Sequence, residues 1–364
     1  MAKSSKADVT SSDSTRCLVN NSILEALILT PESLPLSRNI EDYPEGIIIP
    51  IDKPYRWTSA DVIRKVKYAA IRHFGKKNLK VGHAGTLDPL ATGVLLVCIG
   101  KATKLAETLQ SHDKEYVAGV TFGATTPSYD LEKEIDRFFP HEHITAEAIE
   151  AALPAFLGEQ DQIAPLFSAK SVDGVRAYEL ARRLYRIQNG CNSEDPRLSS
   201  DRHPLAGGGM SSTSHSISDD SPTTDIDAAA KDLIRVARIN ITELELLNVA
   251  GSGLKNRATP LAAGGGARDE VVGGVVFQPT TCNSASSRIN VTDNSELGLP
   301  RAEIRMACSK GTYVRAFARD LGEALGSGAH LDSLQRSRSG IFRVENALTV
   351  EQVLQKLQEP VQHN

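Results

Sequence analysis

Cysteine is scarce and scattered in this chain of 364 residues. The five cysteines are Cys17, Cys98, Cys191, Cys282 and Cys308. They form no Cys-x-x-Cys pair, which argues against both a disulfide scaffold and a structural zinc site. The chain also lacks an apolar run of the ~18–20 residues that a membrane-spanning helix needs, so we expect no membrane segment. Its 40% of hydrophobic residues is enough for a sizeable core.

Acidic residues are nearly absent from one long stretch, although the whole chain has a net charge of −4. Between Lys53 and Lys104, eleven Lys and Arg residues are opposed only by Asp61 and Asp88. Such a chain can present a basic face to a polyanion while remaining acidic overall. Solvated helix faces give the same pattern, so charge alone favours polyanion binding without establishing it.

Hydrophobic periodicity predicts alternating strands and helices along the chain. We predict strands at residues 46–51, 93–100, 114–123, 235–248 and 301–311. We predict helices at residues 58–74, 145–158, 174–185, 313–326 and 349–360. Thr58 or Ser59, Thr145 and Thr349 are suitable N-cap residues, because their hydroxyl groups can accept from the free N–H groups of the first turn. We find no internal repeat.

Composition divides the chain into an ordered region with polar additions. Residues 1–44 begin Ser/Thr-rich and are expected to be a disordered tail. A catalytic domain is expected at residues 45–348, with low-complexity insertions at about residues 189–230 and 249–299, where Gly, Ser, Thr and Asp leave little to bury. Long surface insertions cost little loop entropy once their ends are held. Residues 349–364 are expected to form a C-terminal helix and tail.

The stretch KVGHAGTLDPLATGVLLVCIGKATK, residues 80–104, places a lone aspartate in a loop of small residues. A phosphate-binding P-loop is excluded, because Leu95 stands at its first glycine position and Ala102 follows Lys101. His83 and Asp88 alone are too few for a metal site. A Gly-x-Ser-x-Gly nucleophile motif and a second nearby carboxylate, as glycosidases need, are both missing from this stretch.

The remaining chemistry for Asp88 is that of a carboxylate kept ionised by basic surroundings. Such a group suits covalent attack better than proton donation. The small residues Gly82, Ala84 and Gly85 would let a flat base or another backbone approach closely. A simple turn at Asp88-Pro89 explains the spacing equally well, so the residues alone leave both readings open.

The same stretch resembles the hallmark motif of the TruB family of tRNA pseudouridine synthases. Four further blocks resemble that family, in family order: GIIIPIDKPYRWTSADVIRKVK, DKEYVAGVTFGATTPSYD, QIAPLFSAKSVDGVRAYELARR and CSKGTYVRAFARDLGEALGSGAHLDSLQRSRSG. Together they cover roughly residues 46–340, interrupted by the two insertions, and the residues after them are expected to be too few for the RNA-binding PUA domain that many members of the family carry. The resemblance implies the α+β pseudouridine synthase fold, with one mixed, largely antiparallel central sheet, flanking helices and a basic catalytic cleft.

The resemblance also implies a reaction, the isomerisation of uridine to pseudouridine without any cofactor or metal. Asp88 aligns with the catalytic aspartate, which attacks the target nucleotide covalently at either C1′ or C6. Arg315 aligns with an arginine that pairs with this carboxylate, and such a charge-assisted bond would aim it. Tyr116 aligns with the active-site tyrosine, whose ring would stack on the target base for about 1–3 kcal/mol.

Six further positions are implied to bind the substrate: His83, Lys53, Tyr313, Leu334, Gly82 and Thr86. His83 aligns with a histidine that fills the space left by the flipped nucleotide, a flip that costs a few kcal/mol. Lys53 would hold the active-site loop or a phosphate, or be a plain turn residue. Tyr313 and Leu334 would line the base pocket, although simple packing explains both equally well.

The implied substrate is the T-loop uridine of tRNA, position 55 by tRNA convention, presented on the T-arm and recognised mainly by folded shape. We expect a monomer with no membrane or metal partner. Two alternatives are a guide-dependent enzyme of the dyskerin type and a tRNA-folding chaperone that acts without catalysis. The sequence does not decide among nucleus, cytosol, mitochondrion and plastid.

Overall fold

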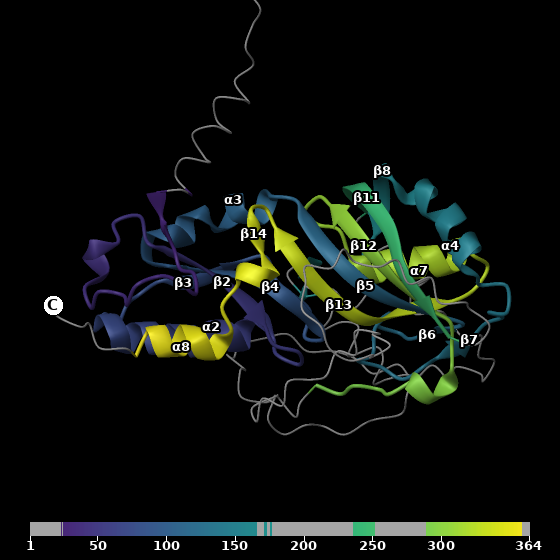
Figure 1. Cartoon of the computed structure of the whole chain (residues 1–364), viewed down its shortest axis with the longest axis horizontal. Helices are drawn as coiled ribbons and strands as arrows, with labels where there is room; N and C mark the ends of the chain where they lie inside the picture. Colours follow the sequence, from purple (N-terminus) through teal and green to yellow (C-terminus); the bar gives the residue numbers. More distant parts are fainter. Residues whose placement is uncertain are drawn as a thin grey trace, which may run out of the picture. The chain divides into compact units, whose positions relative to one another are not determined.

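The structure is a computed structural model that describes residues 23, 25–165, 171–172, 175–176, 236–251 and 289–358. The chain divides into two compact units, residues 1–162 with 238–364, and residues 163–237. The first unit holds the large sheet and all of its helices among the described residues (Figure 1). In the second unit, the described residues form a short antiparallel hairpin of β9 (Ser171–Val172) and β10 (Val175–Arg176).

One mixed sheet of ten described strands organises the first unit. Its strand order is β1-β2-β4-β13-β5-β12-β11-β8, with β3 added to β4 and β14 to β13. The bounds are β1 Leu27–Ile28, β2 Ile47–Lys53, β3 Val81–Ala84, β4 Ala91–Ile99, β5 Lys114–Phe122, β8 Gly158–Ile163, β11 Val236–Ala250, β12 Arg301–Cys308, β13 Ala329–Ser339 and β14 Phe342–Arg343. The β1–β2 and β4–β13 pairs are parallel, whereas β2–β4, β3–β4, β5–β13, β5–β12, β11–β12 and β13–β14 are antiparallel. The predicted α+β class with a mixed, largely antiparallel sheet is confirmed.

Helices flank this sheet, and their starts follow the predicted caps. The bounds are α2 Ser59–Phe74, α3 Ala106–Ser111, α4 Ala146–Ala152, α7 Val314–Ala324 and α8 Val350–Lys356. Thr58, Thr145 and Thr349 each accept a hydrogen bond from the first turn of the helix that follows. A small side hairpin pairs β6 (Ala124–Thr125) with β7 (Arg137–Phe138). Helices α2 and α8 lie side by side (Figure 1).

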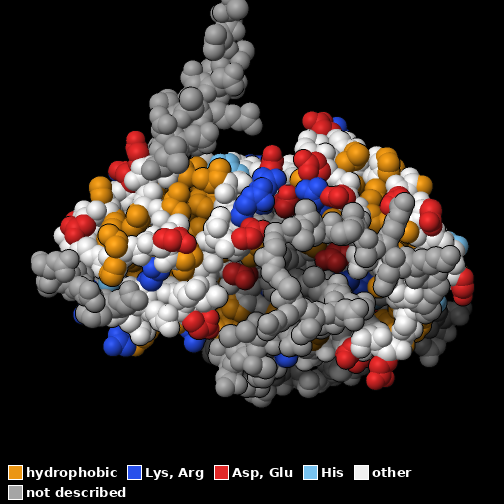
Figure 2. Space-filling view, in the orientation of Figure 1, with side chains coloured by type: hydrophobic (Ala, Val, Ile, Leu, Met, Phe, Trp, Pro, Cys, Tyr) orange, Lys and Arg blue, Asp and Glu red, His pale blue; other side chains and the backbone are white. Residues whose placement is uncertain are grey.

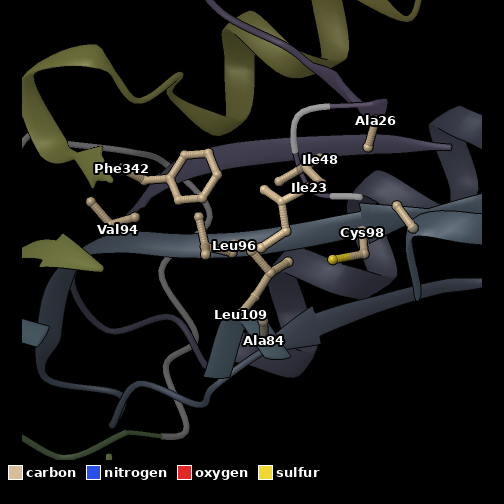
Figure 3. Packing of buried hydrophobic residues seen from close by; sticks show 10 residues of the cluster. Ile23, Ala26, Ile48, Ala84, Val94, Leu96, Cys98, Leu109 and Phe342 are labelled. Carbon is tan, nitrogen blue, oxygen red and sulfur yellow. The ribbon is translucent and has the colours of Figure 1, made fainter. Parts of the chain in front are cut away.

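Part of the hydrophobic core packs on β2 and β4, where buried side chains fill the space above the strands (Figure 3). Ile48, Leu96 and Cys98 come from these two strands, and Phe342 reaches the same cluster from β14. Ile23 and Ala26, which precede β1, belong to it as well. Burial on this scale, about 25 cal/mol per Å² of apolar surface, explains why a short N-terminal segment stays attached.

The expected disordered tail at residues 1–44 is therefore wrong in its second half. β1 pairs in parallel with β2, and the Leu29 N–H extends this ladder by donating to the Ile48 carbonyl at 2.9 Å. Leu29 and Leu36 are fully or almost fully buried, and a 3₁₀ turn at Ile40–Asp42 follows. The expectation extended the Ser/Thr-rich start of the chain too far and missed the apolar run at residues 26–29, which is too short to indicate a strand by periodicity alone.

Two other expectations fall wholly or partly outside the described residues. Of the helix predicted at residues 174–185, only residues 175 and 176 are described, and they lie in β10. Of the insertions predicted at about residues 189–230 and 249–299, only residues 249–251 and 289–299 are described. The strand predicted at residues 46–51 continues through Lys53, so this lysine lies in β2 and not in a turn. No helix in the described part of the chain is long and apolar enough to cross a membrane.

Candidate active site

Three anchors fix the loop that carries Asp88 between β3 and β4. Ser59, at the first turn of α2, exchanges two hydrogen bonds with Leu87: its hydroxyl donates to the carbonyl at 3.2 Å and accepts from the N–H at 3.0 Å. The Ala91 N–H donates to the Asp88 carbonyl at 3.1 Å. Lys53 donates to the Pro89 carbonyl at 3.2 Å. The backbone on both sides of Asp88 is thus held by neighbouring elements.

Arg315 reaches Asp88 from the first turn of α7. Its Nε donates to Asp88 Oδ2 at 2.9 Å, and its Nη1 donates to the Ser128 carbonyl at 3.0 Å. The Arg315 side chain is only 6% exposed, whereas that of Asp88 is 40% exposed. The carboxylate is therefore aimed by a buried group while it remains open to a ligand. An arginine at a helix N-terminus opposes the helix dipole, so nearby carboxylates are needed to stabilise it.

A second carboxylate, Asp130, shares the same guanidinium. Its Oδ2 lies 3.7 Å from Arg315 Nε, while its Oδ1 accepts from the Ser128 hydroxyl at 2.6 Å and from the Glu132 N–H at 2.9 Å. Burial raises the pKa of Asp130, against the lowering effects of Arg315 and these hydrogen bonds, and the charge of Asp88 raises it further. For Arg315, burial lowers the pKa, but Asp88 and Asp130 raise it above its ordinary value. The guanidinium therefore stays charged between two acids.

A pocket opens beside this group. It is lined by Asp88, Leu90, Ala91, Asp130, Leu131, Arg315, Leu331, Asp332, Ser333 and Leu334. Leu334 therefore lines the pocket as expected from the sequence. Apolar walls with a few polar groups at one end are the usual character of a site for a small planar ligand.

Tyr116 lies on β5 and is almost completely buried. Burial raises the pKa of its phenol, partly opposed by the charge of Arg336, and the charge of Asp88 raises it slightly further. The phenol therefore stays protonated at neutral pH. Tyr116 is close enough to Asp88 for their charges to interact, but it is not among the residues that line the pocket.

Arg336 is a buried arginine that supports the catalytic loop from β13. Its guanidinium donates to the carbonyls of Val94 at 2.7 Å, Thr86 at 3.3 Å and Gly85 at 3.3 Å. It is paired with Tyr116 in the sheet and is only 2% exposed. Three carbonyl acceptors on one guanidinium hold the loop backbone to the sheet.

Lys53 is completely buried and donates to three carbonyls, those of Pro54 at 3.0 Å, Trp57 at 2.6 Å and Pro89 at 3.2 Å. Burial lowers its pKa to about 7, although the nearby Asp88 raises it. Because it lies under the loop, the interpretation of Lys53 as a loop anchor fits the structure better than that of a phosphate ligand.

His83 lies on β3, one residue before Ala84, and is partly buried. Burial and the charge of Arg336 lower its pKa, so the imidazole is neutral at pH 7. It is not a pocket-lining residue among the described positions. Gly82, its neighbour, pairs with Cys98 of β4 and has open space where a side chain would stand.

The last two expected positions act through their backbone. Thr86 is exposed, and its carbonyl accepts from Arg336. Tyr313 is the N-cap residue of α7, and Gln162 clamps it: the Tyr313 N–H donates to the Gln162 amide oxygen at 2.8 Å, and the Gln162 amide donates to the Tyr313 carbonyl at 3.1 Å. Thr86 thus helps to position the loop that carries Asp88, and Tyr313 helps to position the first turn that carries Arg315.

Sequence reasoning missed Asp130, Arg336 and Gln162. Arg336 had a usable signal, because it stands two residues after Leu334 in a strand, and such positions share one face. Asp130 ends one family-like block and Gln162 begins another, but neither was singled out, and only the fold shows that they reach the site. Within the described residues, no group of three or more His, Cys, Asp or Glu side chains could hold a metal ion.

Comparison with known proteins identifies the family of the chain. Residues 72–191 match the TruB family pseudouridylate synthase N-terminal domain, and residues 315–362 match the tRNA pseudouridylate synthase B C-terminal domain. The chain is 41% identical over 310 residues to tRNA pseudouridine synthase B of Phocaeicola vulgatus, covering 85% of this chain and 92% of that protein. It is 37% identical to the protein of that name from Parabacteroides distasonis, covering 88% and 97%.

The family matches and these relatives define the protein as a pseudouridine synthase. The chain belongs to the TruB family of pseudouridine synthases and is an isomerase. Among solved structures it is similar to one described as an H/ACA RNP bound to a substrate RNA containing 2′-deoxyuridine. That likeness has 19% identity and a TM-score of 0.43, and it covers 90% of this chain and 56% of the other.

Proposed function

We propose that this chain converts the T-loop uridine of tRNA, at position 55, into pseudouridine, with Asp88 as the covalent nucleophile. The coarser part, isomerisation of a tRNA uridine to pseudouridine, follows from family membership and from the relatives named tRNA pseudouridine synthase B. Those relatives also favour a stand-alone tRNA enzyme over a guide-dependent one. The residue assignment rests on the 2.9 Å hydrogen bond between Arg315, which is buried, and Asp88, whose side chain is partly exposed.

The proposed reaction is an internal rearrangement. Asp88 forms a bond to the nucleotide, either at C1′ of the ribose or at C6 of the base, and the bond between N1 and C1′ breaks. The detached uracil turns within the pocket, and C5 bonds to C1′ as the aspartate leaves. C5 loses its proton and N1 gains one, so the atoms balance without oxidant, reductant or net addition of water.

The remaining side chains have supporting roles in this proposal. Tyr116, whose raised pKa keeps the phenol protonated, packs on the base and can donate a hydrogen bond. Leu334 forms an apolar wall of the base pocket. Lys53, Thr86 and Tyr313 hold the backbone of the catalytic groups, as their contacts indicate.

His83 and Gly82 lie on β3, at the strand that leads into the catalytic loop. We propose that His83 takes the space of the everted nucleotide, because a neutral ring can stack among bases. Gly82 leaves open space for the RNA backbone next to it. We also propose that the protein acts on the T-arm as a monomer, through one catalytic domain at residues 45–348 that carries the two insertions.

The test of the nucleophile is Asp88→Asn, with Asp113→Asn as the matched control on an exposed acid. Purified variants are incubated with unmodified tRNA transcripts, and pseudouridine is mapped by position. We expect Asp88→Asn to lose activity by at least about 10⁴-fold, the scale seen when a nucleophile is removed, and to keep tRNA affinity. Asp113→Asn should behave as wild type.

Three results would overturn parts of the proposal. Product from Asp88→Asn at the wild-type rate would remove the nucleophile assignment. Product at a site other than the T-loop uridine would remove the position. Loss of tRNA binding together with activity would leave the chaperone alternative equally supported.

A further inference from the structure

Arg56 has a backbone conformation that arginine rarely adopts. It lies between β2 and α2 with φ of 62°, and Tyr129 is the other non-glycine residue with positive φ among those described. For a side chain with a Cβ, this left-handed region costs roughly 1–2 kcal/mol. Such strain persists where the surrounding structure requires it, and it is concentrated at functional sites.

The side chain of Arg56 is held at one end and unsatisfied in the middle. Its Nη2 donates to the Ile289 carbonyl at 2.8 Å. Its Nε is buried and has no hydrogen-bond partner among the described residues. A buried charged donor without an acceptor is costly, so contacts with the protein do not fully satisfy this guanidinium.

The contacts of Arg56 connect it to a segment that reaches the pocket. Ile289 is three residues before Thr292, whose N–H donates to the carbonyl of Leu131 at 2.8 Å, and Leu131 lines the pocket. Three residues span at most about 11 Å. Burial raises the pKa of Tyr55, the residue before Arg56, and the charges of the pocket residues Asp130 and Asp332 raise it further. Both observations are consistent with a position of Arg56 near the pocket.

We propose that Arg56 binds a phosphate of the substrate RNA next to the everted nucleotide. The inference rests on the proposed site at Asp88. A nucleotide that enters this pocket brings its flanking phosphates to the rim, and the pocket itself carries three carboxylates, Asp88, Asp130 and Asp332. These repel a phosphate, and a guanidinium at the rim offsets the repulsion. Its planar fork binds phosphate oxygens through two parallel hydrogen bonds.

This role explains why arginine occupies a position that suits glycine. Glycine would adopt φ of 62° without strain, but it would supply no charge. A purely structural role, in which Arg56 only fastens the segment at Ile289, is the competing explanation. The two explanations differ in whether tRNA affinity and its salt dependence change when the charge is removed.

The experiment measures tRNA affinity over a range of salt concentrations, in an Asp88→Asn background so that substrate is not consumed. We expect Arg56→Gln to weaken binding about 10- to 100-fold, as for a lost charged hydrogen bond. The slope of log affinity against log salt should fall by about 0.7–0.9, corresponding to one phosphate contact. Arg56→Lys should keep the slope, because it keeps the charge.

Arg56→Gly separates binding from folding. We expect it to bind as weakly as Arg56→Gln while melting at a higher temperature than wild type, since glycine relieves the strain. Arg343→Gln, an exposed arginine on β14, is the matched control and should change neither affinity nor slope. Wild-type affinity and salt slope in Arg56→Gln would overturn the inference, as would Arg56→Gly that melts lower and binds normally.

These outcomes are distinguishable from failure of the proposed function. The affinity series needs no turnover, so it reports on Arg56 alone. Activity retained by Asp88→Asn would reject the nucleophile whatever the affinity series shows.

Discussion

Two buried cationic side chains near Asp88 each donate hydrogen bonds to several backbone carbonyls. Arg336 and Lys53 each donate to three carbonyls, and both are buried. Desolvating a charge is costly unless hydrogen bonds compensate for it. These two cations therefore fix the catalytic loop because their own burial depends on the carbonyls of that loop.

The buried ammonium of Lys53 gives a pH-dependent stability. Its pKa is about 7 in the folded protein, below the ~10.4 of an unfolded lysine. Between these values the unfolded state binds more protons, so stability rises with pH over this window. We expect the difference in free energy of unfolding between wild type and Lys53→Met to move in favour of the wild type from pH 7 to pH 10. Chemical denaturation at each pH measures it.

The matched control is Lys67→Met, on the exposed face of α2. Its difference from wild type should stay flat over the same range. If the difference in free energy of unfolding between wild type and Lys53→Met also did not change with pH, Lys53 would have an ordinary lysine pKa in the folded protein.

Single residues were predictable where a motif surrounded them. Asp88 and Arg315 stand in long matching blocks, and the structure brings them to 2.9 Å. Asp130 was missed although it ends one of these blocks, because nothing in the sequence shows that it faces Arg315, which is far away in the chain. Arg56 was counted only as one basic residue among eleven, since sequence does not reveal a backbone angle.

At the level of elements, the contact between β4 and β13 decides whether the loop is in place. Gly93 of β4 has φ of 94°, and a Cβ there would lie 2.3 Å from the Arg336 carbonyl. The two residues are partners in this parallel pair. The strands approach more closely than any side chain at position 93 permits.

Gly93→Ala and Gly82→Ala form a matched pair on this feature. We expect Gly93→Ala to destabilise the protein by about 2–4 kcal/mol, because it combines overpacking with an unfavourable φ. Gly82→Ala meets nothing within 4 Å, so stability should change by less than about 0.5 kcal/mol. Thermal and denaturant unfolding of both variants measure this. Equal stability of the two would contradict the close approach.

The starts of the helices were predicted better than the contacts of the elements. The threonine caps of α2, α4 and α8 were correct, since capping depends on residues next to one another in sequence. The strand at β2 was predicted too short, because Asp52-Lys53-Pro54 reads as a turn. The extra length depends on pairing with β4, where Lys53 lies opposite Gly93, and local sequence does not encode that partner.

Ion pairs between neighbouring strands are another feature that the sequence alone does not reveal. Blue and red side chains lie next to one another on part of the face in Figure 2. On β12, Arg305 pairs with Glu245 at 2.5 Å, with Glu243 at 3.6 Å and with Glu115 at 3.7 Å. Such exposed pairs contribute little stability each, and they neutralise charges that a count along the sequence treats as free.

For the whole chain, one histidine joins segments from both ends. His73, at the end of α2, is 3% exposed. Its Nδ1 lies 2.8 Å from the Leu357 carbonyl after α8, and its Nε2 lies 3.0 Å from the Ser37 carbonyl after β1. The segments before β2 and after β14 therefore share one interior partner.

We expect His73→Ala to lower the free energy of unfolding by about 2–4 kcal/mol, through a cavity and lost hydrogen bonds. Hydrogen exchange should speed up in both β1 and α8, because each loses the same contact. His143→Ala is the control, since this exposed histidine also contacts one carbonyl, that of Leu325 at 2.8 Å. Faster hydrogen exchange in only one of β1 and α8 would contradict the interpretation that His73 stabilises both segments.

The sharing of one guanidinium by two carboxylates has a consequence for the reaction cycle. Arg315 faces both Asp88 and Asp130 at rest, so this interior holds one anion too many. In the proposed reaction, esterification of Asp88 to the nucleotide would remove its charge, and one cation would then face one anion. Because Arg315 and Asp130 are buried, the balanced pair should be favoured over the resting arrangement. The proposed adduct would thus relieve a repulsion between two carboxylates that the folded protein places on one guanidinium.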